Sequence, residues 1–228
     1  MSNPGTISLT LPTADPDGIS VSQTPGAAGN LTITGALATA GVATLVPARR
    51  VAVTGAGNEA TKTFTIYGTD RNGATQSETI TGVNTNTVGG LLDFLTVTRV
   101  AVSAATAAAV TVGTNGVGST EWVIDNWPAS SWALSIAVST GGTVTYTVEH
   151  TYDDPNKVGT SLVIPPEQFS EQPAGYVPAK AWPKSDMTAK TADAEANYAN
   201  QPIFAHRLTI TSGTARATMQ SIQNGITS

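Results

Sequence analysis

The stretch from Thr61 to Thr81 reads TKTFTIYGTDRNGATQSETIT, and it predicts two antiparallel β-strands joined by a tight turn. Phe64 and Ile66 alternate with polar residues, which is the two-residue period of a strand buried on one face. The segment Asp70-Arg71-Asn72-Gly73 supplies the turn, because Asn and Gly tolerate the positive φ that hairpin turns require. The return strand ends near Ile80. This hairpin carries no chemistry of its own, so it informs on fold rather than on activity.

The composition of the 228 residues favours strands along the whole chain. Only 12% of the residues are charged, about half the usual share. Small polar and β-branched residues take their place, and these suit a pleated, half-exposed surface. Short alternating segments recur with turn signals between them, which is typical of β-sandwiches. The chain is therefore predicted to be all-β, with two antiparallel β-sandwich domains of jelly-roll or immunoglobulin-like type.

A small-residue linker at Thr114–Ser119 separates the two predicted domains, residues 1–116 and residues 117–228. Residues 1–12 contain the alternating run TISLTL, which predicts either a first strand or an arm that pairs with a neighbouring sheet. The core of the first domain is predicted to contain Phe64, Ile66, Phe94, Val100, Val102, Val110 and Val112.

The second domain is predicted to contain two further hairpins with glycine turns. Trp132–Val138 and Thr143–His150 flank Gly141-Gly142, and residues 206–211 and 214–222 flank Ser212-Gly213. Between these hairpins lies a long irregular insertion at about residues 153–202.

This insertion is rich in Pro, Lys and aromatic residues, and Ser185–Tyr198 predicts a helix from its capping residue and its Ala content. Insertions of this length in compact β domains usually carry a function or an interaction surface. Partner contacts are therefore predicted here first, at Trp182, Tyr176 and Phe169. Contacts are also predicted at the N-terminus, at Ile7, Leu9 and Leu11. For Trp182, a sugar-stacking role and a core role both remain open.

Charge and composition exclude several classes of partner. The net charge of −5 and the absence of a basic run argue against nucleic acid. The N-terminus lacks the features of a signal peptide, and the longest apolar run, near residues 104–112, is too short to span a bilayer. Zero cysteines exclude disulfides and thiolate metal sites. We expect neither nucleic acid nor membrane as a partner.

The sequence also offers little catalytic chemistry. His150 precedes Asp153 and Asp154, but an Asp before Pro155 favours a turn and accounts for these residues. The DxDG run at Asp15–Gly18 lacks the downstream ligands of a calcium loop. The chain contains no GxSxG elbow, no phosphate loop and no dinucleotide fingerprint. We therefore expect no enzyme activity, no catalytic residue, no cofactor and no metal.

Two parts of the chain resemble known modules. VAVTGAGNEATKTFTIYGTDRNGATQSETITGVNTNTV (Val51–Val88) and FLTVTRVAVSAATAAAVTVGT (Phe94–Thr114) resemble a recurrent module of tailed-bacteriophage structural proteins. TVTYTVEHTYDDP (Thr143–Pro155) and IFAHRLTITSGTARATMQSIQNG (Ile203–Gly225) resemble the β-sandwich half that often follows it.

The resemblance implies a non-enzymatic structural component of a virion that is made in the host cytoplasm. The first choice is a capsid-associated decoration or cement protein, oligomeric and bound to the major capsid protein. The alternatives are a neck or tail component that contacts other neck or tail proteins, and a carbohydrate-binding receptor module.

Overall fold

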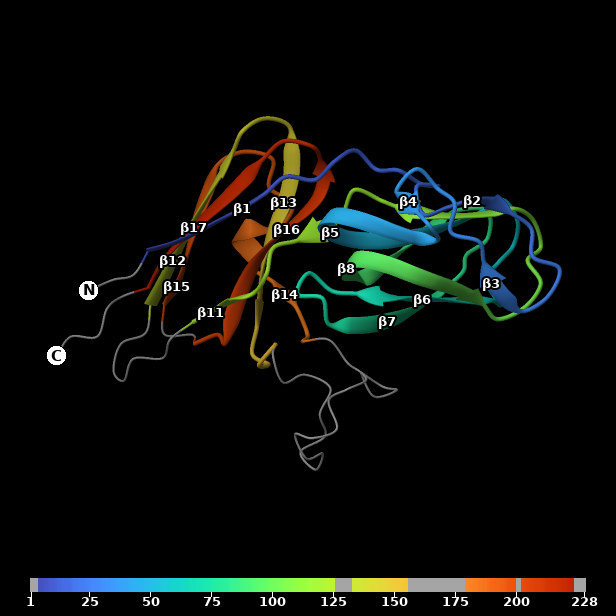
Figure 1. Ribbon diagram of the computed structural model, residues 1–228. Coiled ribbons are helices and arrows are strands. Elements are labelled where there is room, and N and C mark those ends of the chain that lie inside the picture. The colour runs from blue at the N-terminus through green and yellow to red at the C-terminus, as the bar shows by residue number, and fades with distance from the viewer. Residues whose placement is uncertain (1–3, 126–132, 156–178, 200–201, 224–228) are drawn as a thin grey trace, which may run out of the picture. The chain divides into compact units, whose positions relative to one another are not determined.

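The computed structural model describes residues 4–125, 133–155, 179–199 and 202–223, and it is nearly all β, with 59% of its residues in strands (Figure 1). The strand pairs are antiparallel, which confirms the predicted fold class. The chain divides into an N-terminal unit, Pro12–Gly118, and a C-terminal unit, Met1–Leu11 with Ser119–Ser228. The division after Gly118 falls inside the predicted linker. The first strand, however, belongs to the C-terminal unit and not to the domain of residues 1–116.

The N-terminal unit contains one eight-stranded sheet in the order β2-β9-β5-β8-β6-β7, with β3 paired to β8 and β4 to β5. The two longest strands, β5 and β8, contain register shifts, and irregularities of this kind bend strands so that a sheet wraps around its core. The strands are β2 (Ser20–Gln23), β3 (Gly29–Leu31), β4 (Ala38–Thr39), β5 (Val42–Gly55), β6 (Thr63–Thr69), β7 (Thr75–Thr81), β8 (Thr87–Val102) and β9 (Val110–Thr114).

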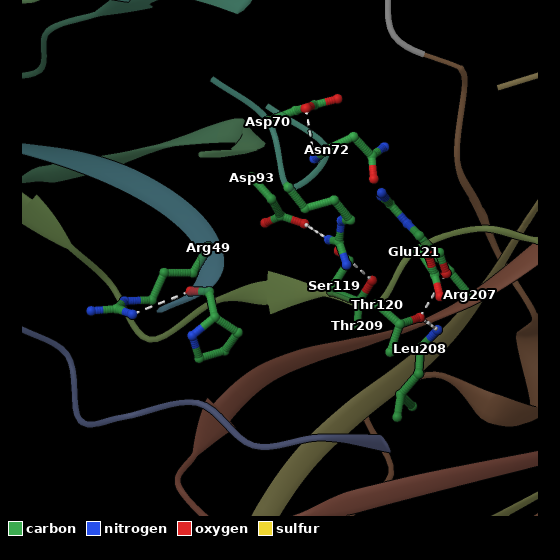
Figure 2. Close-up of polar contacts among 12 residues, drawn as sticks. Arg49, Asp70, Asn72, Asp93, Ser119, Thr120, Glu121, Arg207, Leu208 and Thr209 are labelled. Carbon is green, nitrogen blue, oxygen red and sulfur yellow. Dashed lines mark hydrogen bonds and ion pairs between the residues drawn. The ribbon is translucent and has the colours of Figure 1, made fainter. Parts of the chain in front are cut away.

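The predicted central hairpin is present as β6 and β7, which pair from Thr63↔Thr81 to Thr69↔Thr75. Its turn is organised by Asp70, whose Oδ1 accepts a hydrogen bond from the backbone N–H of Asn72 at 2.8 Å (Figure 2). The same Oδ1 also accepts from the backbone N–H of Ala74 at 2.9 Å. Gly73 has a φ of 83°, a conformation that a residue with a side chain rarely adopts. The turn residues thus act as the sequence predicts.

The apolar side chains of this hairpin form part of the core of the N-terminal unit. Phe64 lies opposite Val102 and Ile66 opposite Val100, and these side chains are buried together. Each fully buried aliphatic or aromatic side chain of this size contributes about 1.5–3 kcal/mol through removal from water. The structure confirms the whole predicted core of this unit, which is Phe64, Ile66, Phe94, Val100, Val102, Val110 and Val112.

The C-terminal unit contains two sheets, β1-β17-β12-β15 and β10-β16-β13-β14, with β11 paired to β16. One hydrophobic cluster draws residues from both sheets, so the core lies between them as in a sandwich. The strands are β1 (Pro4–Leu9), β10 (Gly118–Ser119), β11 (Val123–Ile124), β12 (Ala133–Thr140), β13 (Val144–Thr151), β14 (Trp182–Pro183), β15 (Ala194–Ala199), β16 (Ala205–Gly213) and β17 (Ala217–Gln223).

The two hairpins predicted in this unit are wrong in their pairing. Within the described residues β12 pairs with β15 and β17, and β13 pairs with β14 and β16. Gly141-Gly142 and Ser212-Gly213 therefore carry the chain from one sheet to the other. In this arrangement Ile136 of β12 and Tyr146 of β13 are both buried in the shared core. Alternation identifies the buried face of each strand, but a glycine turn fits a hairpin and a change of sheet equally well.

The helix predicted at Ser185–Tyr198 is also wrong. This segment forms a short 3₁₀ turn, η2 (Ser185–Met187), followed by strand β15. Ala196 and Tyr198 are buried and alternate with exposed residues, because β15 pairs with β12 at the edge of the four-stranded sheet. Pairing and burial override the helix propensity of Ala. In the described part of the chain, a helix of membrane-spanning length and apolarity is absent.

Candidate functional site

The predicted N-terminal contact residues lie inside their own chain. Strand β1 pairs with β17 in register from Pro4↔Ile222 to Leu9↔Ala217. Leu9 and Leu11 are buried in the core of the C-terminal unit, and Ile7 packs against that core. The structure thus places these three residues against the core of their own unit, where their alternating apolar face completes the sandwich.

The insertion residue Trp182 remains a candidate contact. It lies on the two-residue strand β14, and 43% of its surface is exposed. The Lys180 ammonium lies 4.0 Å from its ring centroid, which is a cation–π contact. Tyr152, which follows β13, is 51% exposed. The other two predicted contacts of the insertion, Tyr176 and Phe169, lie outside the described residues.

Trp182 belongs to a row of side chains that crosses the second sheet. The row runs from Val123 on β11 to His206 on β16, then to His150 on β13 and Trp182 on β14. Residues directly opposite one another in an antiparallel sheet share a face. Val123 packs against the core, so the row marks the core face of this sheet. We call these four residues the imidazole row.

His206 forms a buried pair with Asp125. Its Nδ1 lies 3.0 Å from Oδ2 of Asp125, and both side chains are nearly inaccessible, at 0% and 3% exposure. The backbone N–H of Asp125 donates to the carbonyl of Phe204 at 3.0 Å, which fixes the carboxylate beside the ring. Within the described residues Nε2 of His206 has no hydrogen-bond partner. A carboxylate in this position places the imidazole proton on Nδ1.

His150 contacts the opposite sheet through Tyr198 of β15. The Tyr198 hydroxyl and His150 Nδ1 are 3.1 Å apart, and the two rings meet edge to face. Burial raises the pKa of Tyr198, and Asp186 adds to the rise. Burial lowers the pKa of His150, and the Lys184 ammonium lowers it further. A neutral His150 imidazole that accepts a hydrogen bond from the Tyr198 hydroxyl agrees with the raised pKa of Tyr198 and the lowered pKa of His150.

This arrangement does not bring together the His-Asp-Asp group that the sequence allowed at residues 150–154. Asp153 accepts a hydrogen bond from Lys180 N–H at 3.0 Å, while His150 contacts Tyr198. Among the described residues, no cluster of three or more His, Asp or Glu side chains is arranged to hold a metal ion. The imidazole row joins strands and sheets together and carries an exposed aromatic residue at its end.

On the other face of the same sheet, a polar network occupies the strand ends. Glu149 bonds to Nε of Arg207 at 2.7 Å and accepts the Thr209 hydroxyl at 2.8 Å. The Leu208 N–H donates to the hydroxyl of Thr120 at 3.1 Å, as Figure 2 shows. These bonds attach the segment that carries β10 to β16.

In the N-terminal unit, two carboxylates hold loops and bulges. Glu59 is 1% exposed and accepts hydrogen bonds from the N–H groups of Ala107 and Ala108. Glu78 accepts from the N–H groups of Leu91 and Leu92, at 2.6 and 3.2 Å. Burial raises the pKa of Glu78. Both carboxylates stabilise the local backbone.

Sequence reasoning missed Asp125 and Tyr198 as partners of the two histidines. Asp125 is 81 residues from His206, and Tyr198 is 48 residues from His150. Neither separation carries a spacing signal, because each pair depends on which strands become neighbours. The only available signal was the rarity of histidine in the chain, which contains two.

Comparison with known proteins does not assign this chain to a family. No family model matches the chain, and no curated protein matches it. A solved structure entitled "Structure of infectious bursal disease virus Gx strain" aligns at 10% identity over 98% of this chain and 70% of that chain. Its TM-score is 0.20, which is too low to support a conclusion about fold or function.

Proposed function

We propose that this chain is a non-enzymatic structural component of a bacteriophage virion that decorates or cements the head by protein–protein contacts. The observation that carries the proposal is the N-terminal unit, which spans most of the segment that resembles phage structural modules. Its buried Glu59 and half-buried Glu78 are engaged by backbone N–H groups of the unit itself. A carboxylate committed in this way stabilises the protein and is poorly placed to act on a substrate.

The surface of this unit supports the same role. Threonine hydroxyls pair across neighbouring strands, at 2.7 Å for Thr54 and Thr87 and at 3.1 Å for Thr65 and Thr79. Cross-strand pairs of this kind each contribute roughly 0.2–1 kcal/mol relative to alanine. A sheet with such cross-strand pairs, in a chain with few charged residues, suits a particle component that works by contact in many copies.

Immunogold labelling of purified phage particles tests the location. Label over the whole head supports a decoration or cement protein that binds the major capsid protein. Label at one vertex or along the tail contradicts the head role and favours a neck or tail component. Complete absence of the chain from purified particles contradicts a virion role of any kind.

The exposed aromatic side chains of Trp182 and Tyr152 favour a second candidate, a carbohydrate-binding receptor module. Exposed aromatic rings near a cation suit stacking on sugar rings. If this second function holds, Trp182→Ala abolishes glycan binding to the purified protein while its circular dichroism stays unchanged. Leu91→Ala, which removes a side chain that is 67% exposed in the N-terminal unit, is the matched control. Equal binding by Trp182→Ala and the unmodified protein contradicts the receptor function.

A further inference from the structure

Strand β1 is separated in sequence from the rest of the unit in which it folds. Met1–Leu11 belongs to the C-terminal unit, while Pro12–Gly118 forms the N-terminal unit. All six residues of β1 pair with β17 alone, at the edge of the four-stranded sheet. This strand is therefore held by one neighbouring strand and by a few apolar side chains.

After Leu11, which is buried in the core, the connection that follows β1 has few constraints of its own. Thr10, Pro12, Thr13 and Ala14 are exposed and lie outside the strands. The chain is next fixed at Asp15, whose backbone N–H donates to the Thr114 hydroxyl at 3.1 Å and whose carbonyl accepts Thr114 N–H at 2.7 Å. Short hinge segments of this kind, here with a proline, favour the exchange of a terminal element between identical chains.

The site that β1 occupies contacts both its backbone and its apolar side chains. Without it, Ala217–Ile222 of β17 presents a row of unpaired backbone groups, and the core loses Leu9 and Leu11. An edge of this type binds an added strand through main-chain hydrogen bonds, with alternate side chains providing specificity. The segment in the sequence known to fit this edge is β1 itself, including the hydrogen bond of 2.9 Å between the Ser8 and Thr218 hydroxyls.

We propose that β1 is exchanged between two copies of this chain, so that residues 4–11 of each copy complete the four-stranded sheet of the other. The exchanged dimer makes the same strand contacts as the single chain, and it is favoured by high local concentration. The occupant of the β17 edge is thus the N-terminal strand of a second copy. This inference does not depend on a virion role, since it requires only a second copy.

Mixed disulfide trapping tests the exchange in the full chain, which contains no cysteine. Thr6→Cys and Gln220→Cys are made in separate chains, since these residues are Cα partners across β1 and β17. The two variants, one with a size tag, are co-expressed, purified and oxidised. A disulfide between the two chains that exceeds random oxidation requires β1 of one copy to lie beside β17 of the other.

A matched control measures random oxidation. Thr65→Cys and Thr79→Cys are Cα partners inside the β6–β7 hairpin, which is not expected to exchange its strands. We expect roughly tenfold or more mixed disulfide from the Thr6/Gln220 combination than from the hairpin combination, because exchange holds the partners together. Ser8→Cys with Thr218→Cys should behave like Thr6/Gln220.

The same oxidation experiment can also contradict the exchange of β1. Mixed disulfide at the level of the hairpin control, with the double variant Thr6→Cys/Gln220→Cys forming its disulfide within one chain, overturns the exchange. That outcome would leave β1 as an internal strand and would not bear on the presence of the protein in phage particles.

Discussion

The two units of this protein use their polar residues in different ways. In the N-terminal unit the carboxylates of the buried Glu59 and the half-buried Glu78 accept hydrogen bonds from neighbouring backbone N–H groups, and the hydrophobic cluster of this unit is apolar. In the C-terminal unit the imidazole row crosses one sheet, and His150 extends to Tyr198 on the other. The carboxylates of the first unit thus stabilise its own backbone. The second combines a core with titratable groups and an exposed aromatic residue, so it is the better candidate for regulated contact.

The largest expected effect tests whether the units unfold separately. Phe64→Ala should destabilise the N-terminal unit by about 3–5 kcal/mol through loss of buried surface and a residual cavity. All four tryptophans lie in the C-terminal unit, so tryptophan fluorescence reports on that unit. Urea unfolding should show a lower midpoint by far-UV circular dichroism and an almost unchanged midpoint by fluorescence. An equal shift by both probes would show that the two cores unfold together.

A second substitution tests close packing between neighbouring strands of the N-terminal unit. A Cβ added at Gly68 would overlap the carbonyl oxygen of Thr96 on β8. Gly68→Ala should therefore cost about 1–3 kcal/mol, in the range typical of overpacking. Gly26→Ala is the matched control, since an added Cβ there meets no atom within 4 Å. Similar thermal midpoints for the two variants would contradict the close approach of β6 and β8.

A third substitution affects the buried pair of the C-terminal unit. Asp125→Ala removes the partner of His206 Nδ1 and should destabilise this unit by about 1–3 kcal/mol, the cost of an unsatisfied buried polar group. Asp125→Asn retains an acceptor and should recover part of the loss. Fluorescence-detected urea unfolding measures both. If Asp125→Ala leaves the fluorescence midpoint unchanged, the pair does not support the sandwich.

The smallest expected effect is a pH dependence of opposite sign in the two units. The pKa of His150 is lowered in the folded chain, so the unfolded chain binds more protons just below the ordinary histidine value of about 6.5. The C-terminal unit should therefore lose stability as pH falls through that range. The pKa of Glu78 is raised, so in the range above its ordinary value the folded chain binds more protons. The contribution of Glu78 to the stability of the N-terminal unit should therefore increase as pH falls.

Unfolding by urea at a series of pH values between neutral and mildly acidic measures both slopes. His150→Gln should flatten the slope seen by fluorescence, and Glu78→Gln should flatten the slope of the N-terminal unit seen by circular dichroism. If His150→Gln leaves the acid loss of the C-terminal unit intact, another group causes it. Lys184, Asp186 and His206 are the charged or titratable neighbours to replace next.

The extent of prediction from sequence also differs between the units. In the N-terminal unit, alternation identified the core from Phe64 to Val112, and the turn at Asp70–Gly73 fixed the pairing of β6 with β7. Both signals are local. In the C-terminal unit, alternation identifies the buried faces of the strands but not their neighbours, so the glycine turns predict hairpins that the structure does not contain. The local composition of β15 predicts a helix, but pairing with β12 and burial decide its form, and neither can be read from the local sequence.

The predicted contact residues of the candidate site also differ in how well the sequence places them. Trp182 was predicted as a contact from its place in a Pro-rich segment, and it is exposed. Leu9 and Leu11 were predicted as contacts from their place near the terminus, and they are buried. Their partner β17 lies at the other end of the chain. A pattern of alternating residues does not show whether its apolar face meets its own chain or another.

The stoichiometry of the chain in purified phage particles tests the proposed head role most directly. Quantitative mass spectrometry with isotope-labelled peptides gives its copy number relative to the major capsid protein. A decoration or cement protein is predicted to be present in many copies, in a fixed ratio to the capsid subunits. A copy number limited to a single ring at one vertex, or absence from the particles, would contradict that role.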